Sequence, residues 1–216
     1  MAPSVRSPVI HNLVEMHMYL MAFAWLIAAP IAIAIAIYGR FFKVKWWVKA
    51  HMLIMGFGVG LPFSVAAIAG MVASHGFKPR PHMVLGAIIT FLAWGQIALG
   101  VTNHIIFRLS KKRRTRRPWH NSLHLWLGRF VTVLSIINVL LGIQMRHLPY
   151  GVFIAYCAWL AFLIFGFTAL YWCVLTRQQI LQQKAVATSE APSSSSAAAA
   201  ATADVDETVK STEEKK

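Results

Sequence analysis

The sequence predicts an all-α integral membrane protein with about five transmembrane helices, from its composition and from its long apolar segments. The chain has 216 residues, of which 57% are hydrophobic and 13% are charged, whereas soluble domains carry roughly 25% charged residues. Apolar segments of about twenty residues are long enough to cross a bilayer as helices, which satisfy their own backbone polar groups there. Such segments cover residues 17–38, 51–73, 83–107, 121–144 and 150–175.

These segments divide the chain into three parts. We expect a short extracellular or lumenal N-terminus over 1–16, a transmembrane domain over 17–176 and a disordered cytosolic tail over 177–216. The tail is rich in Ser and Ala and then acidic, with no periodic apolar face, and such a composition cannot bury a core. The first apolar segment is too long for a cleaved signal peptide, and Glu15 precedes it.

Basic residues are concentrated in two loops on the same predicted side of the membrane. The loops after the first and third spans hold eleven Lys and Arg, whereas the loops on the opposite side hold three. Because cytosolic loops carry the excess of positive charge, the N-terminus is predicted to lie outside the cytosol and the C-terminus within it. KKRRTRR resembles a nucleic-acid-binding patch. Between two spans, however, a topology signal that touches anionic lipid explains it, and we expect no nucleic-acid partner.

Histidines open four of the predicted spans. Nine are present in the chain, and four lie at the heads of the first four spans: His17, His51, His82 and His124. Since successive spans cross the membrane in opposite directions, we expect His17 and His82 at the outer level. His51 and His124 are expected at the inner level.

Two internal repeats relate these histidines. HMYLMAFA at 17–24 resembles HMLIMGFG at 51–58, with His, Met and Phe at matching positions. A second repeat relates the third and fourth spans, where one constant offset carries His82, Gly86, Gln96 and Gly100 onto His124, Gly128, Asn138 and Gly142. Each repeat joins two antiparallel spans, which indicates an inverted repeat with a pseudo-two-fold axis in the membrane plane.

Two histidines at one depth favour haem over zinc. Zinc sites use three or four protein ligands, whereas haem iron needs only two axial ligands and the apolar side chains of a bundle suit the porphyrin face. One turn after a ligand, Gly86 and Gly128 are expected to leave room for the macrocycle, and Met21 and Met55 to pack against it. Arg129 has no acidic neighbour in sequence, so we expect it to pair with a haem propionate.

Other interpretations of these residues stay open. His120, one turn before His124, is the alternative ligand of the fourth span. Gln96 and Asn138 either touch a haem or join helices by hydrogen bonds, and a glycine in a membrane helix often marks close packing. Without a cofactor, the chain would be a membrane scaffold or a small transporter, which inverted repeats also favour.

The succession H-x-x-x-M, H-x-x-x-M, PHMVLG and RRPWHNSLHLWLGR resembles the cytochrome b561 family. The resemblance is strongest to the branch that joins this core to an extracellular DOMON domain, and it covers about residues 15–175. Only sixteen residues precede the first span, so we expect no DOMON domain. The resemblance implies two b-type haems with His17, His51, His82 and His124 as iron ligands, in a four-helix bundle with a peripheral fifth helix.

The function expected from this resemblance is electron transfer across a membrane. The donor would be a cytosolic, ascorbate-like reductant, and the acceptor an extracellular or lumenal ferric chelate or redox partner. Two axial histidines leave no open position at iron, so such a haem transfers electrons rather than activating a bound ligand. Activity as an ascorbate- or ferric-reductase-like oxidoreductase is left open, as is a homodimer. We expect membrane lipid to surround the chain.

Overall fold

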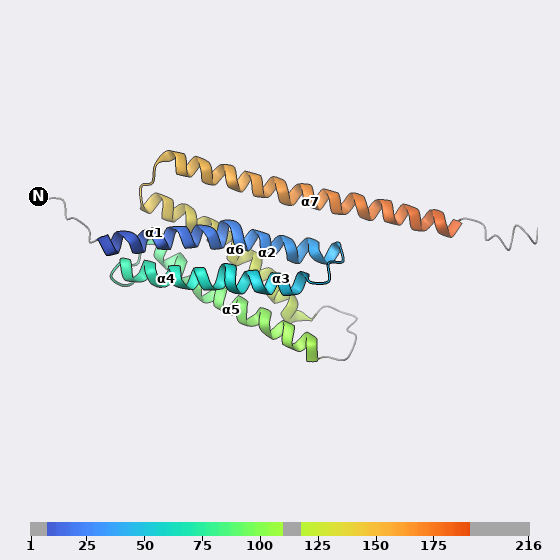
Figure 1. The fold of residues 1–216 in the computed structure, drawn as a ribbon, viewed down its shortest axis with the longest axis horizontal. Coiled ribbons are helices and arrows are strands. Elements are labelled where there is room, and N and C mark those ends of the chain that lie inside the picture. The colour runs from blue at the N-terminus through green and yellow to red at the C-terminus, as the bar shows by residue number, and fades with distance from the viewer. Residues whose placement is uncertain (1–7, 110–117, 191–216) are drawn as a thin grey trace, which may run out of the picture. The chain divides into compact units, whose positions relative to one another are not determined.

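The computed structural model describes residues 8–109 and 118–190, which form helices joined by short turns, with no strand among them (Figure 1). Five helical stretches are long and apolar enough to cross a membrane: Pro8–Gly39, Trp47–Ala73, Pro81–Leu109, Trp119–Met145 and Tyr150–Thr188. The prediction of an all-helical chain with five apolar helices of membrane-spanning length is confirmed.

The first two stretches are interrupted by π-helical segments. The first stretch comprises α1 (Pro8–Ala22), η1 (Phe23–Ala28), α2 (Ala29–Ala34) and η2 (Ile35–Gly39), and the second comprises α3 (Trp47–Leu53), η3 (Ile54–Gly60) and α4 (Leu61–Ala73). Pro30 and Pro62 lie in the first turn of α2 and α4, directly after η1 and η3. Proline has no backbone N–H and its ring displaces the carbonyl four residues earlier, which explains a wider helical turn before each proline.

The other three stretches are continuous helices: α5 (Pro81–Leu109), α6 (Trp119–Met145) and α7 (Tyr150–Glu190). Two boundaries differ from the predicted ones. α1 begins at Pro8, within the predicted N-terminal segment, and α7 continues to Glu190, so that residues 177–190 of the predicted disordered tail are helical. The Gln, Leu, Ala and Lys residues there favour a helix. The rest of the tail and most of the second basic loop lie outside the described residues.

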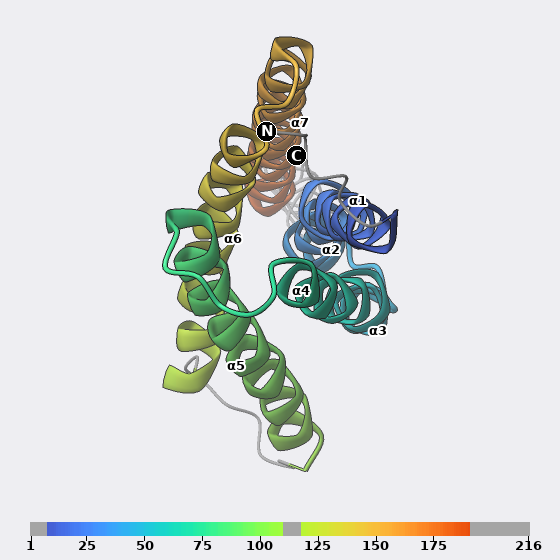
Figure 2. The same cartoon turned by 90° about the vertical axis from the view of Figure 1, so that its left-hand side faces the viewer.

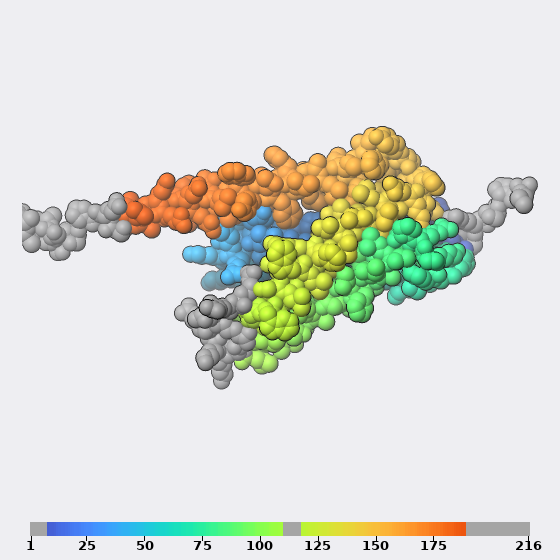
Figure 3. Space-filling model, turned by 180° about the vertical axis from the view of Figure 1, so that it is seen from behind, coloured from blue at the N-terminus to red at the C-terminus, as the bar shows by residue number. Residues whose placement is uncertain are grey.

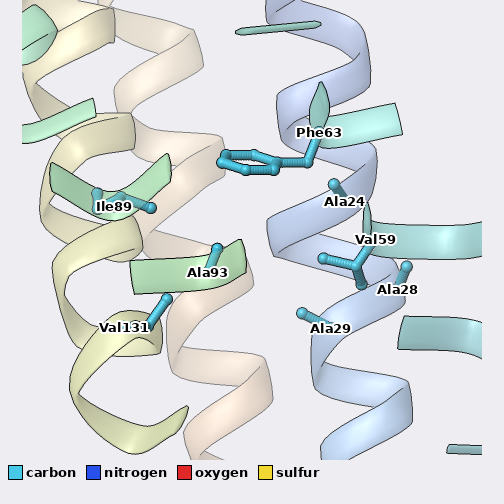
Figure 4. Close-up of a cluster of buried hydrophobic side chains, with 8 residues drawn as sticks. All are labelled: Ala24, Ala28, Ala29, Val59, Phe63, Ile89, Ala93 and Val131. Atoms are coloured by element: carbon cyan, nitrogen blue, oxygen red, sulfur yellow. The ribbon is translucent and has the colours of Figure 1, made fainter. Parts of the chain in front are cut away.

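The chain divides into two units, residues 1–167 and 168–216. In the first unit the helices form two antiparallel pairs: α1, η1 and α2 lie beside α3, η3 and α4, and α5 lies beside α6 (Figure 1 and Figure 2). The two pairs meet at a buried apolar cluster (Figure 4), made of Ala24, Ala28, Ala29, Val59, Phe63, Ile89, Ala93 and Val131. Its alanines let the helix backbones approach closely. In the second unit, the described part of α7 is mostly exposed.

Within the first unit, hydrogen bonds from three aromatic side chains join the beginning of α7 to the other helices. Each goes to a main-chain carbonyl: Tyr156 Oη to Ile136 at 2.8 Å, Trp159 Nε1 to Leu26 at 2.9 Å, and Tyr38 Oη to Phe167 at 2.8 Å. Most other side chains of α7 are exposed. Large apolar side chains of α5 and α6 are also exposed, including Phe91, Trp94 and Trp126. Figure 3 shows α5 and α6 side by side on one face of the molecule. Such surfaces are compatible with an integral membrane protein.

Candidate functional site

The structure brings His17 and His82 into contact. His17 lies on α1 and His82 at the start of α5, so the contact links the two helix pairs. Their ring centroids are 6.0 Å apart and their planes are 89° to each other. Two imidazoles that bind one metal ion from opposite sides have centroids on the order of 6 Å apart, because each metal–nitrogen bond is about 2 Å long. The spacing of this pair therefore suits two axial ligands.

His51 and His124 form the second pair. His51 lies on α3 and His124 on α6, so this pair also links the two helix pairs. His51 acts electrostatically on the His124 ring, without the direct ring contact that joins His17 and His82. The described part of the chain thus shows ring contact between His17 and His82 and an electrostatic interaction between His51 and His124. That each pair holds a haem stays a prediction.

Backbone carbonyls of the neighbouring helix hold the rings. Three Nδ1 atoms donate a hydrogen bond to such a carbonyl: His17 to Ala66 at 2.7 Å, His51 to Ala32 at 2.9 Å, and His82 to Asn138 at 3.0 Å. A carbonyl only accepts hydrogen bonds, so Nδ1 carries the proton in each ring. Nε2 is then the unprotonated nitrogen that is available to a metal, and such an Nδ1 bond is the usual support of a metal-binding histidine.

The contacts repeat with the offsets seen in the sequence. The offset from Ala32 to Ala66 is the same as the offset from His17 to His51, so the two bonds of this helix pair are reciprocal. In the other pair, the offset that relates His124 to His82 makes Gln96 the equivalent of Asn138.

The fourth ring is the exception to this pattern. The Gln96 backbone interacts with the His124 ring, but His124 Nδ1 is outside hydrogen-bond geometry and is buried without a partner. The equivalent backbone position thus faces the ring at both ends of the α5–α6 pair, with a looser contact at His124 than at His82.

Glycines of the neighbouring helices allow three of these rings to lie against the backbone. An added Cβ at Gly70 would lie 2.6 Å from His17 Nδ1, one at Gly142 would lie 3.1 Å from His82 Cε1, and one at Gly100 would lie 3.0 Å from His124 Cε1. Sequence reasoning assigned no role to Gly70. Gly100 and Gly142 did belong to the repeat that relates the third and fourth spans, which was the available signal for them.

Gly86 and Gly128 face amide side chains. A Cβ at Gly128 would lie 2.7 Å from Gln96 Nε2, and one at Gly86 would lie 3.3 Å from Asn138 Nδ2. Both glycines therefore permit close contact between α5 and α6. Their expected role in making room for a macrocycle stays a prediction.

The guanidinium of Arg129 lies over the ring of Trp126, 4.8 Å from its centroid, which is a cation–π contact. The carboxylate of Glu15 pairs with His11, and no described carboxylate pairs with Arg129. The expected pairing of Arg129 with a haem propionate stays a prediction.

His120 has a different environment from His124. Its Nδ1 donates to Asn103 Oδ1, and Asn103 Nδ2 donates to the His120 carbonyl at 3.4 Å. The His124 ring interacts electrostatically with His51. His75 and His147 lie in the turns after α4 and α6, with φ of 55° and 49°.

Each pair offers two protein ligands, which are too few for most metal ions but enough for haem. The described residues contain no group of three or more His, Cys, Asp or Glu side chains that could hold a metal ion. Zinc needs more protein ligands than two, whereas haem brings four nitrogens of its own and takes two axial ligands. The facing rings of His17 and His82 and the protonated Nδ1 atoms fit this demand.

We also compared the chain with models of known protein families, with curated proteins and with solved structures, and none of the three comparisons found a match.

Proposed function

We propose that this chain is an integral membrane protein that transfers electrons across the membrane through two b-type haems. His17 and His82 would hold one haem and His51 and His124 the other, in a four-helix bundle with α7 at its periphery. The donor is a cytosolic, ascorbate-like reductant, and the acceptor is an extracellular or lumenal ferric chelate or redox partner. The observation that carries the proposal is the repeated bond from Nδ1 to a backbone carbonyl, which leaves Nε2 free for iron.

The residues around each histidine orient its ring and limit the access of water to the site. The carbonyls of Ala66, Ala32 and Asn138 fix the rotation of three rings. When bound, a haem would supply one-electron exchange, with the two histidines of each pair holding its iron. The buried apolar cluster between the helix pairs keeps water out of the centre of the bundle.

The charge distribution supports the direction of transfer. The loop between the first two stretches carries Arg40, Lys43 and Lys45 near the His51 end of the chain. Positive-inside orientation puts this loop in the cytosol, where its charge attracts an anionic reductant. Arg129 would bind a propionate of the inner haem.

Haem content tests the proposal. We expect two haems per chain, extractable with acid–acetone because the chain has no C-x-x-C-H attachment motif. His17→Ala and His82→Ala should each remove the same spectral component, and His51→Ala and His124→Ala the other, because losing one axial ligand leaves its partner unpaired. The measurement is haem quantitation with reduced-minus-oxidised spectra of each purified variant.

His120→Ala is the matched control and should retain both haems. A colourless wild-type protein would refute the proposal and favour the scaffold or transporter interpretation. If His17→Ala and His51→Ala removed the same component while His82→Ala spared it, the pairing would be wrong.

A further inference from the structure

Arg146 ends α6 beside the His82 ring. It is the C-cap residue of this helix, and it follows Gly142 by one turn. An added Cβ at Gly142 would lie 3.1 Å from His82 Cε1, so the His82 ring rests on this part of α6. Because residues four apart lie on the same face of a helix, Arg146 continues the surface on which the ring rests, toward the end of the helix.

The guanidinium of Arg146 is partly withdrawn from solvent and lacks an acceptor. The residue is partly buried, and its Nε is buried without a hydrogen-bond partner among the described residues. The other two bases of the predicted outer loops, Lys78 and Arg80, are exposed. Burying part of a cation costs free energy unless an acceptor or an anion meets it. Glu15 is the only acid in the first 189 residues, and it pairs with His11.

The sequence repeat leaves the outer site without the cation that is proposed for the inner one. The offset that relates His82 to His124 makes Ala87 the equivalent of Arg129, the residue assigned above to a propionate of the inner haem. Alanine cannot make such a contact, so a haem at the outer site needs another cation. Arginine suits this role, because its planar fork of N–H donors matches a carboxylate.

We propose that Arg146 is a cofactor-binding residue that pairs with a propionate of the haem held by His17 and His82. This inference rests on the proposed function, since it requires a haem at that site. The pairing would give the Arg146 guanidinium the anion that the described chain does not provide. It would also turn the charged edge of the haem toward the end of α6, which is the outer side in the proposed orientation.

Haem dimethyl ester tests the inference, because its esterified propionates carry no charge. The full chain is purified without haem and titrated with haem and with the ester, in a His124→Ala background that leaves only the His17/His82 site. Arg146→Gln should weaken haem binding by about 10- to 100-fold, which is the effect of one hydrogen bond to a charged group. Binding of the ester should be unchanged, because the ester has no carboxylate to pair with.

Arg80→Gln is the matched control. It removes the same charge from an exposed position just before α5 and should leave haem affinity unchanged. Equal losses of haem and ester binding in Arg146→Gln would mean that Arg146 only supports the end of α6. Unchanged haem affinity would mean that it contacts no propionate. Either result would overturn the inference.

A second measurement does not depend on the folding of the Arg146 variant. With Arg146 in place, the same His124→Ala background should bind haem about 10- to 100-fold more tightly than the ester. Equal affinities for the two ligands would contradict the pairing. Absence of haem binding by the wild-type chain would instead overturn the proposed function itself, so the two failures are distinguishable.

Discussion

At the scale of single residues, one ring nitrogen of each of three candidate histidines is held by the backbone of a neighbouring helix. His17 and His51 donate to the carbonyls of Ala66 and Ala32, and small residues at these positions bring carbonyl and ring within reach. Gly70 continues this surface, one turn beyond Ala66 on α4. The surroundings of these rings are therefore made largely by small residues of the neighbouring helix.

Gly70→Ala tests this role. The added Cβ would lie 2.6 Å from His17 Nδ1, closer than van der Waals contact allows, so the ring must move away from its Ala66 partner. Changes in the surroundings of metal-binding histidines cost roughly 10- to 100-fold in affinity, and we expect a loss of that order for the His17/His82 haem alone. Haem titration of the apoprotein measures it.

Gly95→Ala is the control for the Gly70 variant, because a Cβ at Gly95 meets nothing within 4 Å. It should leave haem affinity unchanged, and alanine is the better helix former. Wild-type affinity in Gly70→Ala would mean that the His17 ring does not rest on this glycine when haem is bound.

At the scale of the elements, the prolines of the first two stretches leave carbonyls that need other partners. In an α-helix the Leu26 carbonyl would accept from the amide of residue 30, but Pro30 has no N–H. Trp159 on α7 donates to this carbonyl at 2.9 Å. The beginning of α7 thus adds a hydrogen bond at a carbonyl that lacks its α-helical partner, which helps the stretch to tolerate proline in an apolar environment.

Trp159→Phe should lower the free energy of unfolding by about 1 kcal/mol, the scale of one hydrogen bond inside a membrane protein. In a Pro30→Ala background the loss should be smaller, because the new amide at residue 30 can donate to Leu26. A double-mutant cycle measured by unfolding in mixed micelles gives the coupling. Trp94→Phe, at a site 52% exposed, is the control, and additive effects of the Trp159 and Pro30 changes would contradict the assignment.

The sequence predicted the helices because they depend on a local signal. Apolar length predicts each stretch, and the alternating direction of the stretches predicts which histidines share an end. The sequence did not predict that Ala66 and Gly70 surround His17, because such contacts depend on how each helix is rotated about its axis. It also did not predict the helix over 177–190, because the polar composition there was taken as a sign of disorder although most of its residues are helix formers.

At the scale of the whole molecule, the reciprocal contacts of His17 and His51 indicate how far apart the two candidate sites lie. Ala32, the partner of His51, lies fifteen residues after His17 on the same stretch, and fifteen residues of helix rise about 22 Å. This separation is most of the roughly 30 Å hydrocarbon thickness. Two haems held in this way would lie near opposite faces of a membrane, which is the arrangement that electron transfer across it requires.

The direction of that transfer depends on the orientation of the chain, which forms the last prediction. The loops after the first and third spans predicted from the sequence hold eleven Lys and Arg, against three in the opposing loops, and such an imbalance keeps the basic side in the cytosol. In a variant whose exposed Cys157 and Cys173 are replaced by Ser, Phe77→Cys should react with a membrane-impermeant maleimide added outside intact cells. Thr115→Cys should react only after the membrane is permeabilised. Labelling of the Thr115 variant from outside would invert the orientation, and the reductant would then have to reach the His51/His124 haem from the extracellular or lumenal side.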